Sequence, residues 1–263
     1  MVDCEPIDHE LRDCVFSHVE GFYKRYFEVK AWSVAVDELA RELSPATADI
    51  PRILGSHESL STWLTLLLSH PRAVNLITSR FRVQEGRGAR LIYLEAPDHS
   101  DSTSPGTRIR LFGQVNPLGT PESTVLDFLE HARTVFAACP TRLFLHAFRL
   151  HGAILELWMF DRSGAYSSPP LDIAHCPGLL VKTLAGYALM TDEEVGLSPF
   201  IRHDGLGSRF ITFANPTDLD AQRFYLQEQP ATPHPARYTN RHLSSSNSPD
   251  ATKPTTESLR CYN

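Results

Sequence analysis

One segment constrains the fold more than any other: residues 142–164 read RLFLHAFRLHGAILELWMFDRSG. Apolar side chains alternate along it before and after a His151-Gly152 pair, which predicts two strands joined by a tight turn. The second strand is largely apolar on both of its faces. We therefore expect it in the middle of a sheet that is covered on each side. The sequence DRSG at 161–164 then ends this strand with residues that favour turns.

Other hydrophobic patterns surround this hairpin. Apolar residues three and four apart predict helices over residues 7–26, 30–43, 59–69, 120–136 and 179–190. Alternating apolar residues predict further strands over residues 90–95, 107–112 and 209–213. The expected fold class is α/β or α+β: a mixed central sheet with helices packed on it, preceded by a mainly helical segment.

The same patterns predict three regions along the chain. Residues 1–88 are expected to be mainly helical, and residues 89–228 to form the sheet domain. Residues 229–263 shift to Pro, Ser, Thr and Asn with scattered charges. Such a composition buries too little apolar surface to offset the entropy of ordering, so we expect a disordered tail.

Charge and cysteine content exclude several classes of protein. The 263 residues carry a formal net charge of -6, which is no strong signal for nucleic-acid binding. The amino terminus lacks the pattern of a secretory signal peptide, and the longest apolar run is too short to span a membrane, so an intracellular protein, cytoplasmic or nuclear, is expected. The five cysteines include no CxxC pair and the twelve histidines are scattered, so we expect free thiols, no metal site and no cofactor.

Three stretches carry a family resemblance: LFGQVNP, then LDFLEHARTVFAACPTRLFLHAFRLHGAILELWMFDRSGAYSS, then LLVKTLAGYALMTDEEVGLSPFI. In this order and spacing they resemble the amino-terminal portion of the fungal-type protein kinase family, over roughly residues 109–201. The resemblance implies a fungal intracellular protein from a phosphotransferase family, in which the kinase lobes follow this region.

The chemistry of a kinase is not visible in these residues. Phosphoryl transfer needs a Gly-rich loop over the phosphates, a strand lysine, a catalytic aspartate and a metal-binding DFG-type aspartate. The nearest candidates are HDGLG at 203–207, which lacks the third glycine, and DRSG at 161–164, which sits on the wrong element. The chain is therefore predicted to be inactive as a kinase.

A weaker resemblance links the upstream sheet to the PD-(D/E)XK nuclease fold, whose site uses an acid on one strand and an acid-x-lysine on the next. In the fungal kinase family the corresponding turn commonly reads Gly-Glu-Leu-Lys, whereas here it reads GQVN at 113–116. Gln114 replaces the acid and Asn116 replaces the lysine, and Glu95 is the candidate upstream acid. One carboxylate does not make a magnesium site, so Glu95, Gln114 and Asn116 are predicted to form a degenerate site.

Several prominent side chains have simpler interpretations. Asp161 and Arg162 are either interaction residues or, more simply, part of a structural turn in which the Asp161 carboxylate caps its own backbone. Arg142 is expected at the surface or in an ion pair, and Trp158 in the core.

The leading hypothesis is a non-catalytic relative of the fungal-type protein kinases that acts as an interaction or regulatory module, with a protein partner that the sequence does not identify. The alternatives are a fragment of an active kinase completed by another chain, a divergent nuclease-like enzyme, or a truncated product without selected function. The substrate and the oligomeric state are not encoded in any pattern found here.

Overall fold

A computed structural model describes most of the chain before residue 199 and three short strands after it. The described residues are 14–43, 56–74, 77–86, 89–96, 109–116, 125–198, 200–203, 209–213 and 222–226. The predicted tail at 229–263 lies outside them. The chain divides into two compact units, residues 1–199 and 200–263. The helical segment and the hairpin therefore belong to one unit.

The first unit is built on one mixed sheet. Its strands are β1 (Val15–Phe16), β2 (Arg80–Glu85), β3 (Arg90–Glu95), β4 (Ile109–Asn116), β5 (Phe144–His151), β6 (Ile154–Asp161), β7 (Ala165–Ser167) and β8 (Leu171–Asp172). They follow the order β1-β7-β6-β5-β4-β3-β2, with β8 paired to β6. β4 and β5 are parallel, as are β1 and β7, and the other pairs are antiparallel.

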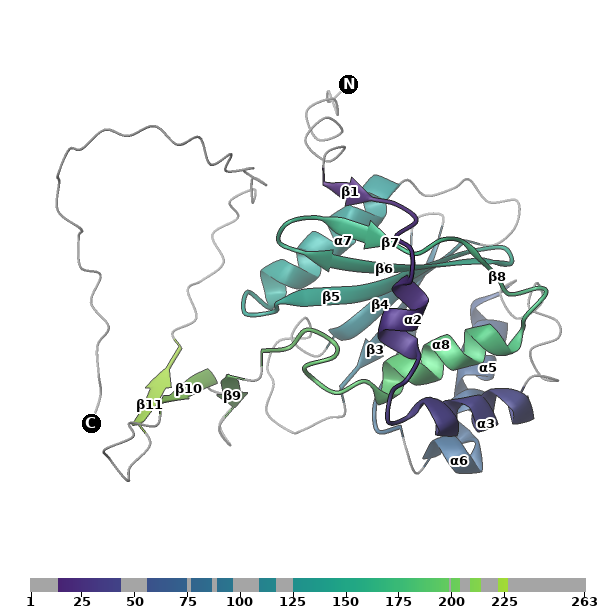
Figure 1. Ribbon diagram of the computed structural model, residues 1–263, viewed down its shortest axis with the longest axis horizontal. Helices are drawn as coiled ribbons and strands as arrows, with labels where there is room; N and C mark the ends of the chain where they lie inside the picture. Colours follow the sequence, from purple (N-terminus) through teal and green to yellow (C-terminus); the bar gives the residue numbers. More distant parts are fainter. Residues whose placement is uncertain are drawn as a thin grey trace, which may run out of the picture. The chain divides into compact units, whose positions relative to one another are not determined.

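Helices cover both faces of this sheet (Figure 1). They are α2 (Phe22–Phe27), α3 (Ser33–Leu43), α5 (His57–Ser69), α6 (Pro71–Val74), α7 (Val125–Ala138) and α8 (Gly178–Leu189). In Figure 1, α7 lies behind the sheet, and α2 and α8 lie in front of it. The predicted fold class is thus confirmed, including the helical segment that precedes most of the sheet. None of the helices in the described ranges is long and apolar enough to cross a membrane.

The two faces of the sheet bury separate apolar clusters. One face packs against α8, α3 and α5, and its cluster includes Leu111, Leu155, Leu157 and Leu184. The opposite face packs against α7, and its cluster includes Phe112, Phe128, Trp158 and Phe160. We call these the α8 face and the α7 face. Because side chains alternate along a strand, even-numbered residues of β4 and β6 lie on the α7 face.

The hairpin of β5 and β6 lies in the middle of the sheet, as its apolar pattern predicts. Leu145, Leu155 and Leu157 are fully buried, and Trp158 is only 3% exposed. The turn, however, is shifted by one residue. His151 pairs with Ile154, so the turn residues are Gly152 and Ala153, and Gly152 adopts the left-handed conformation with φ 55°.

Four strands of the first unit were not predicted. β2 lies inside residues 1–88, which were expected to be mainly helical. β1 lies inside the helix expected over residues 7–26. Among the described residues of that range, only those of α2 are helical. β7 and β8 follow the hairpin as two short strands. β1, β7 and β8, with two or three residues each, show too little periodicity to be recognised from sequence, an explanation that does not apply to the six residues of β2.

The second unit is a three-stranded antiparallel sheet of β9 (Ile201–His203), β10 (Arg209–Phe213) and β11 (Gln222–Tyr225). The rings of Phe210 and Tyr225 lie 5.8 Å apart between centroids, and the Arg223 guanidinium lies 4.9 Å from the Phe210 ring centroid. The predicted strand at 209–213 is thus present. The sheet domain expected over 89–228 is divided between the two units at residue 199.

Candidate functional site: the carboxyl ends of β4 and β5

Five polar side chains gather where the parallel strands β4 and β5 end. The register pairs Gln114 with Arg149 and Asn116 with His151, and it pairs Arg149 with Glu156 across the hairpin. We call these five residues the strand-end cluster. All lie on the α7 face by the alternation of their strands. The carboxyl ends of parallel strands are the usual location of ligand sites in open α/β sheets.

The cluster is largely removed from solvent. Gln114 is 5% exposed and Asn116 is 3% exposed. The Arg149 guanidinium lies 3.6 Å from the Glu156 carboxylate, and its Cζ lies 5.9 Å from the ring centroid of Phe128 in α7. The contact with Phe128 places the first turns of α7 beside the cluster.

Gln114 Oε1 and His151 Nδ1 of the cluster are buried without a hydrogen-bond partner. Leaving a buried donor or acceptor unpaired costs about 1–3 kcal/mol, so such atoms need an explanation. A bound group that donates to Gln114 Oε1 would recover part of this cost. The charges of Arg149 and Glu156 neutralise each other. The cluster therefore suits hydrogen bonding to a ligand that carries little net charge.

The cluster does not offer the ligands of a metal site. Glu156 is its single carboxylate, and an amide oxygen supplies no charge to a divalent cation. Within the part of the chain that the structure describes, no group of three or more His, Cys, Asp and Glu residues could hold a metal ion.

Glu95 does not belong to this cluster. It pairs with Ile109 at the other end of β4, five residues before Gln114, which corresponds to about 17 Å along a strand. The Arg82 Nε donates to Glu95 Oε1 at 2.6 Å, and the Arg80 Nε lies 3.6 Å from Glu95 Oε2. The prediction that Glu95 shares a degenerate site with Gln114 and Asn116 is corrected by the antiparallel register, which places Leu91 opposite Gln114.

The predicted turn at 113–116 is also corrected, since these residues form the second half of β4. Gly113 is required there by packing. A Cβ on this residue would lie 2.0 Å from the Phe148 Cζ, well inside van der Waals contact. The glycine of the GQVN sequence therefore leaves room for the Phe148 ring to cross the strand. The alternation of side chains along β4 places Gln114 and Asn116 on the α7 face.

Asp161 forms a turn with its own backbone. Its Oδ1 accepts hydrogen bonds from the Ser163 N–H at 2.7 Å and from the Gly164 N–H at 2.9 Å. Arg162 donates to the Pro140 carbonyl, and its guanidinium lies 5.8 Å from the Phe136 ring centroid. These contacts tie the end of β6 to the end of α7.

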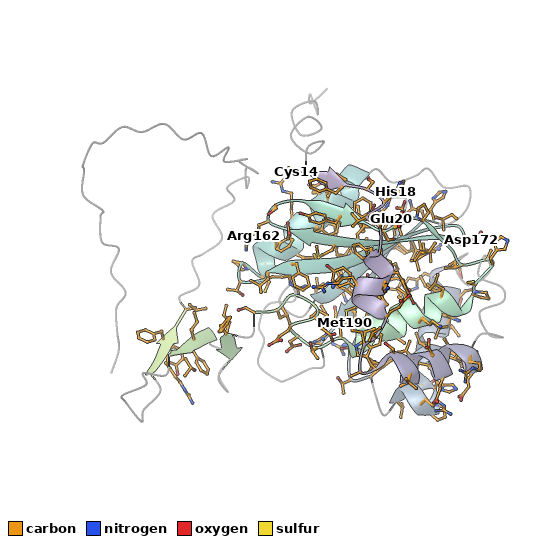
Figure 2. The ribbon with its side chains drawn as sticks, viewed as in Figure 1. Cys14, His18, Glu20, Arg162, Asp172 and Met190 are labelled. Atoms are coloured by element: carbon orange, nitrogen blue, oxygen red, sulfur yellow. The ribbon has the colours of Figure 1, made fainter. Side chains whose placement is uncertain are left out.

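The rest of the SGAYSS stretch attaches the amino-terminal segment to the sheet. A Cβ on Gly164 would lie 2.3 Å from the Cys14 carbonyl oxygen, which accepts a hydrogen bond from Ala165 N at 2.8 Å. The Ser167 hydroxyl accepts from the His18 N–H at 3.2 Å. Cys14 and His18 stand on either side of β1 (Figure 2). This stretch thus serves strand pairing.

Arg142 is a correction to the sequence analysis, because it is buried rather than on the surface. It is 1% exposed, and its guanidinium donates to the carbonyl oxygens of Arg110, at 2.8 Å, and Ile109. Burial lowers the pKa of the Arg142 guanidinium. The residue fastens the start of β5 to the start of β4, which no local pattern could show.

The TDEEVG stretch at 191–196 closes the same end of the sheet. Asp192 accepts from Arg110 at 2.5 Å, and Arg110 also donates to the carbonyl oxygen of Met190, which follows α8 (Figure 2). Glu194 and Thr191 bond each other's backbone N–H groups, and Glu194 lies 3.3 Å from the Lys30 ammonium. Hydrogen bonds from Thr191 and Lys30 hold the pKa of Glu194 below its usual value, against the opposing effect of burial.

Gln114 and Asn116 were predicted as site residues from the sequence, whereas Arg149, His151 and Glu156 were not. A signal existed in the hairpin, because residues equidistant from a two-residue turn face each other. With the turn placed at His151-Gly152, Arg149 has the wrong partner. Placing it at Gly152-Ala153 pairs Arg149 with Glu156.

Comparison with known families identifies one match. The model of a family described as Fungal protein kinase matches residues 98–239, which is just over half of the chain and includes β4 to β8, α7, α8 and the three strands β9 to β11 of the second unit. No curated protein and no solved structure matches this chain.

Proposed function

The chain belongs to the fungal protein kinase family, and we propose that its α/β unit is a non-catalytic interaction or regulatory module that binds through the strand-end cluster. The observation that carries this proposal is the row formed by Gln114, Arg149 and Glu156 across three strands. It presents an unpaired amide oxygen beside a compensated ion pair, at the edge where such sheets receive ligands.

The sequence supports a role other than phosphoryl transfer. Its 263 residues include no Gly-rich loop with three glycines, no strand lysine in a kinase context and no HRD or DFG sequence. Phosphoryl transfer depends on positioning and on electrostatic stabilisation by these groups and the metals they hold. Without them, ATP has no residues to orient its γ-phosphate in this chain.

The test of this proposal is transfer of radiolabelled phosphate from ATP to casein or to the protein itself in magnesium. We expect no transfer above a heat-killed control. Transfer that disappears on heating would overturn the non-catalytic proposal. Transfer that appears only after a second kinase-family chain is added would establish the alternative of a kinase fragment completed elsewhere.

The nuclease-like alternative is tested at the same cluster. Phosphodiester cleavage needs carboxylates for a divalent cation and a cation beside the attacking water. The cluster offers one carboxylate, Glu156, and amides at Gln114 and Asn116. We expect no cleavage of plasmid, single-stranded DNA or RNA in magnesium or manganese. Cleavage that is lost in Glu156→Gln but kept in Glu95→Ala would establish the nuclease at this site.

Binding at the cluster can be followed without knowing the natural ligand. Saturation with small carboxamides and short peptides should shift the NMR signals of the Gln114 and Asn116 side-chain amides before those of surface amides. The matched control is Gln84, whose side-chain oxygen accepts from Arg82 at 3.1 Å outside the cluster. Equal shifts at Gln84 and Gln114 would contradict a binding role for the cluster.

A further inference from the structure

A concave site lies between α2, α3 and α8, and none of its lining residues belongs to the strand-end cluster. This cavity has a volume of about 270 Å³. Its walls include Tyr23, Phe27, Trp32 and Val36, and its charged residues are Glu28, Asp37 and Lys182. We call it the aromatic pocket. Its volume is at the small end for ligand sites, which suits one side chain or head group rather than a nucleotide.

The aromatic wall is fixed by packing. The rings of Tyr23 and Phe27 stack with centroids 5.0 Å apart, and Trp32 meets Phe27 edge to face at 6.3 Å. Gly186 of α8 makes this possible, because a Cβ there would lie 2.9 Å from two Trp32 carbons and 3.0 Å from Phe27 Cδ1. The wall therefore rests directly on the backbone of α8.

The loop between α2 and α3 is held in a strained conformation beside this wall. Val29 has φ 55°, a left-handed conformation that is rare for a β-branched residue, and it is 93% exposed. The Ser33 hydroxyl accepts from the Lys30 N–H at 2.8 Å and donates to the Phe27 carbonyl at 3.3 Å. Backbone strain that the surroundings maintain is a recurrent feature of binding sites.

The charges of the aromatic pocket favour a cation. Two carboxylates, Glu28 and Asp37, line it with one ammonium, Lys182. The Lys182 Nζ lies 2.6 Å from Asp37 Oδ1, and both side chains are about half exposed, so this ion pair contributes little and can be displaced. Burial, followed by the charges of Asp37 and Glu28, raises the pKa of Tyr23 to about 12.

We propose that the aromatic pocket binds a methylated ammonium group. Aromatic faces attract such cations, Trp most strongly, and the nearby carboxylates add charge complementarity. The methyl groups match the apolar walls, whereas an unmethylated ammonium keeps its hydration shell. The group would come from a free quaternary amine or from a methylated lysine side chain.

The first experiment compares tetramethylammonium with tert-butanol, a neutral molecule of similar shape, by ligand-observed NMR on the full chain. We expect saturable binding of tetramethylammonium with a dissociation constant on the order of 1 mM, and much weaker binding of tert-butanol. No saturable binding, or equal binding of the two probes, would overturn the proposal. Choline and a trimethyllysine peptide, each beside its unmethylated form, then distinguish the two sources.

The variants predict effects of opposite sign. Glu28→Gln and Asp37→Asn should each weaken tetramethylammonium binding about threefold, and Lys182→Gln should strengthen it about threefold by removing the competing ammonium. Glu20→Gln is the matched control, since this exposed residue precedes α2 and does not line the pocket (Figure 2). Its affinity should be unchanged. If Glu20→Gln lost as much affinity for tetramethylammonium as Glu28→Gln, the effect would come from the net charge of the protein, and the proposed site would be wrong.

The aromatic contribution is tested with Trp32→Ala, which should weaken binding tenfold or more. Because Trp32 packs on Gly186, its thermal unfolding is measured alongside. If that variant does not fold, the substitutions at the exposed Glu28 and the half-exposed Lys182 still decide the proposal. Unchanged affinity in a folded Trp32→Ala protein would overturn it.

Discussion

The two ends of the parallel pair β4 and β5 both bury polar side chains, but they satisfy them differently. At the amino end, Arg110 and Arg142 each donate to at least two oxygens of neighbouring segments. At the carboxyl end, Gln114 Oε1 and His151 Nδ1 are buried without a partner. Unpaired atoms occur at both ends, because Arg110 Nε, Arg142 Nε and both ring nitrogens of His146 are also buried without a partner at the amino end. The ends differ in the bonds that they do make: Arg110 and Arg142 join separate segments and so stabilise the fold, whereas the Gln114 amide oxygen keeps its capacity to accept a hydrogen bond from a ligand.

The largest effect is expected at the amino end. Arg142→Ala would leave the carbonyl oxygens of Ile109 and Arg110 without these donors and would open a cavity. We expect a loss of about 3–5 kcal/mol in the free energy of unfolding, measured by urea denaturation. Arg142→Lys should keep one of the bonds and lose less. A loss below about 1 kcal/mol would mean that the amino end is not fastened by this residue.

The second effect is a pH dependence at the same end. His146 on β5 is fully buried against Tyr26 and Tyr187, and burial lowers its pKa to about 4, assisted by the charges of Arg142 and Lys30 and opposed by Glu194. The unfolded chain, with a histidine pKa of about 6.5, binds more protons between these values. Stability from this group is therefore complete above about pH 6.5 and is lost as the pH falls toward 4.

The measurement is the free energy of unfolding at pH 7 and pH 5. The His146 contribution should make the protein about 2 kcal/mol less stable at pH 5. His146→Phe should flatten this part of the profile, and the carboxylates common to both proteins cancel in the difference. Parallel profiles for the parent and the variant would show that this ring titrates in the folded state as it does in the unfolded chain.

A smaller effect is expected at the DRSG turn, where β6 ends beside the start of β5. Asp161→Ala removes the acceptor for the Ser163 and Gly164 N–H groups and should cost about 1 kcal/mol. Asp161→Asn keeps one acceptor oxygen and should cost less. Thermal unfolding distinguishes the two, and an unchanged melting temperature in Asp161→Ala would show that solvent replaces the turn bonds.

The smallest effect on stability is expected at the carboxyl end, where a substitution should leave stability almost unchanged or increase it. Gln114→Met replaces an amide whose oxygen has no partner with an apolar group of similar size. Because the desolvation cost of the amide oxygen disappears, stability should change by less than about 1 kcal/mol or increase. Calorimetry of the parent and the variant gives the comparison. A loss as large as that of Arg142→Ala would mean that both ends are structural.

Local patterns in the sequence determined much of the secondary structure and the family. The alternation in 142–164 predicted the central hairpin, and the spacing of apolar residues predicted α3, α5, α7 and α8 within a few residues. The three family stretches predicted the family whose model matches residues 98–239. These features depend on residues that are close in the sequence, within one turn of a helix or within one strand. They can therefore be predicted without knowledge of the tertiary structure.

Only the tertiary structure decided which residues meet. The crossover through α7 makes β4 parallel to β5 and so brings Gln114 beside Arg149, 35 residues later. The antiparallel register of β3 moves Glu95 to the opposite end of β4, and the position of the turn at Gly152 pairs Arg149 with Glu156. Arg142 is buried because carbonyl oxygens of another strand receive its guanidinium. Long-range pairing leaves no periodic trace in the sequence, because a strand shows which face is apolar but not which strand lies beside it.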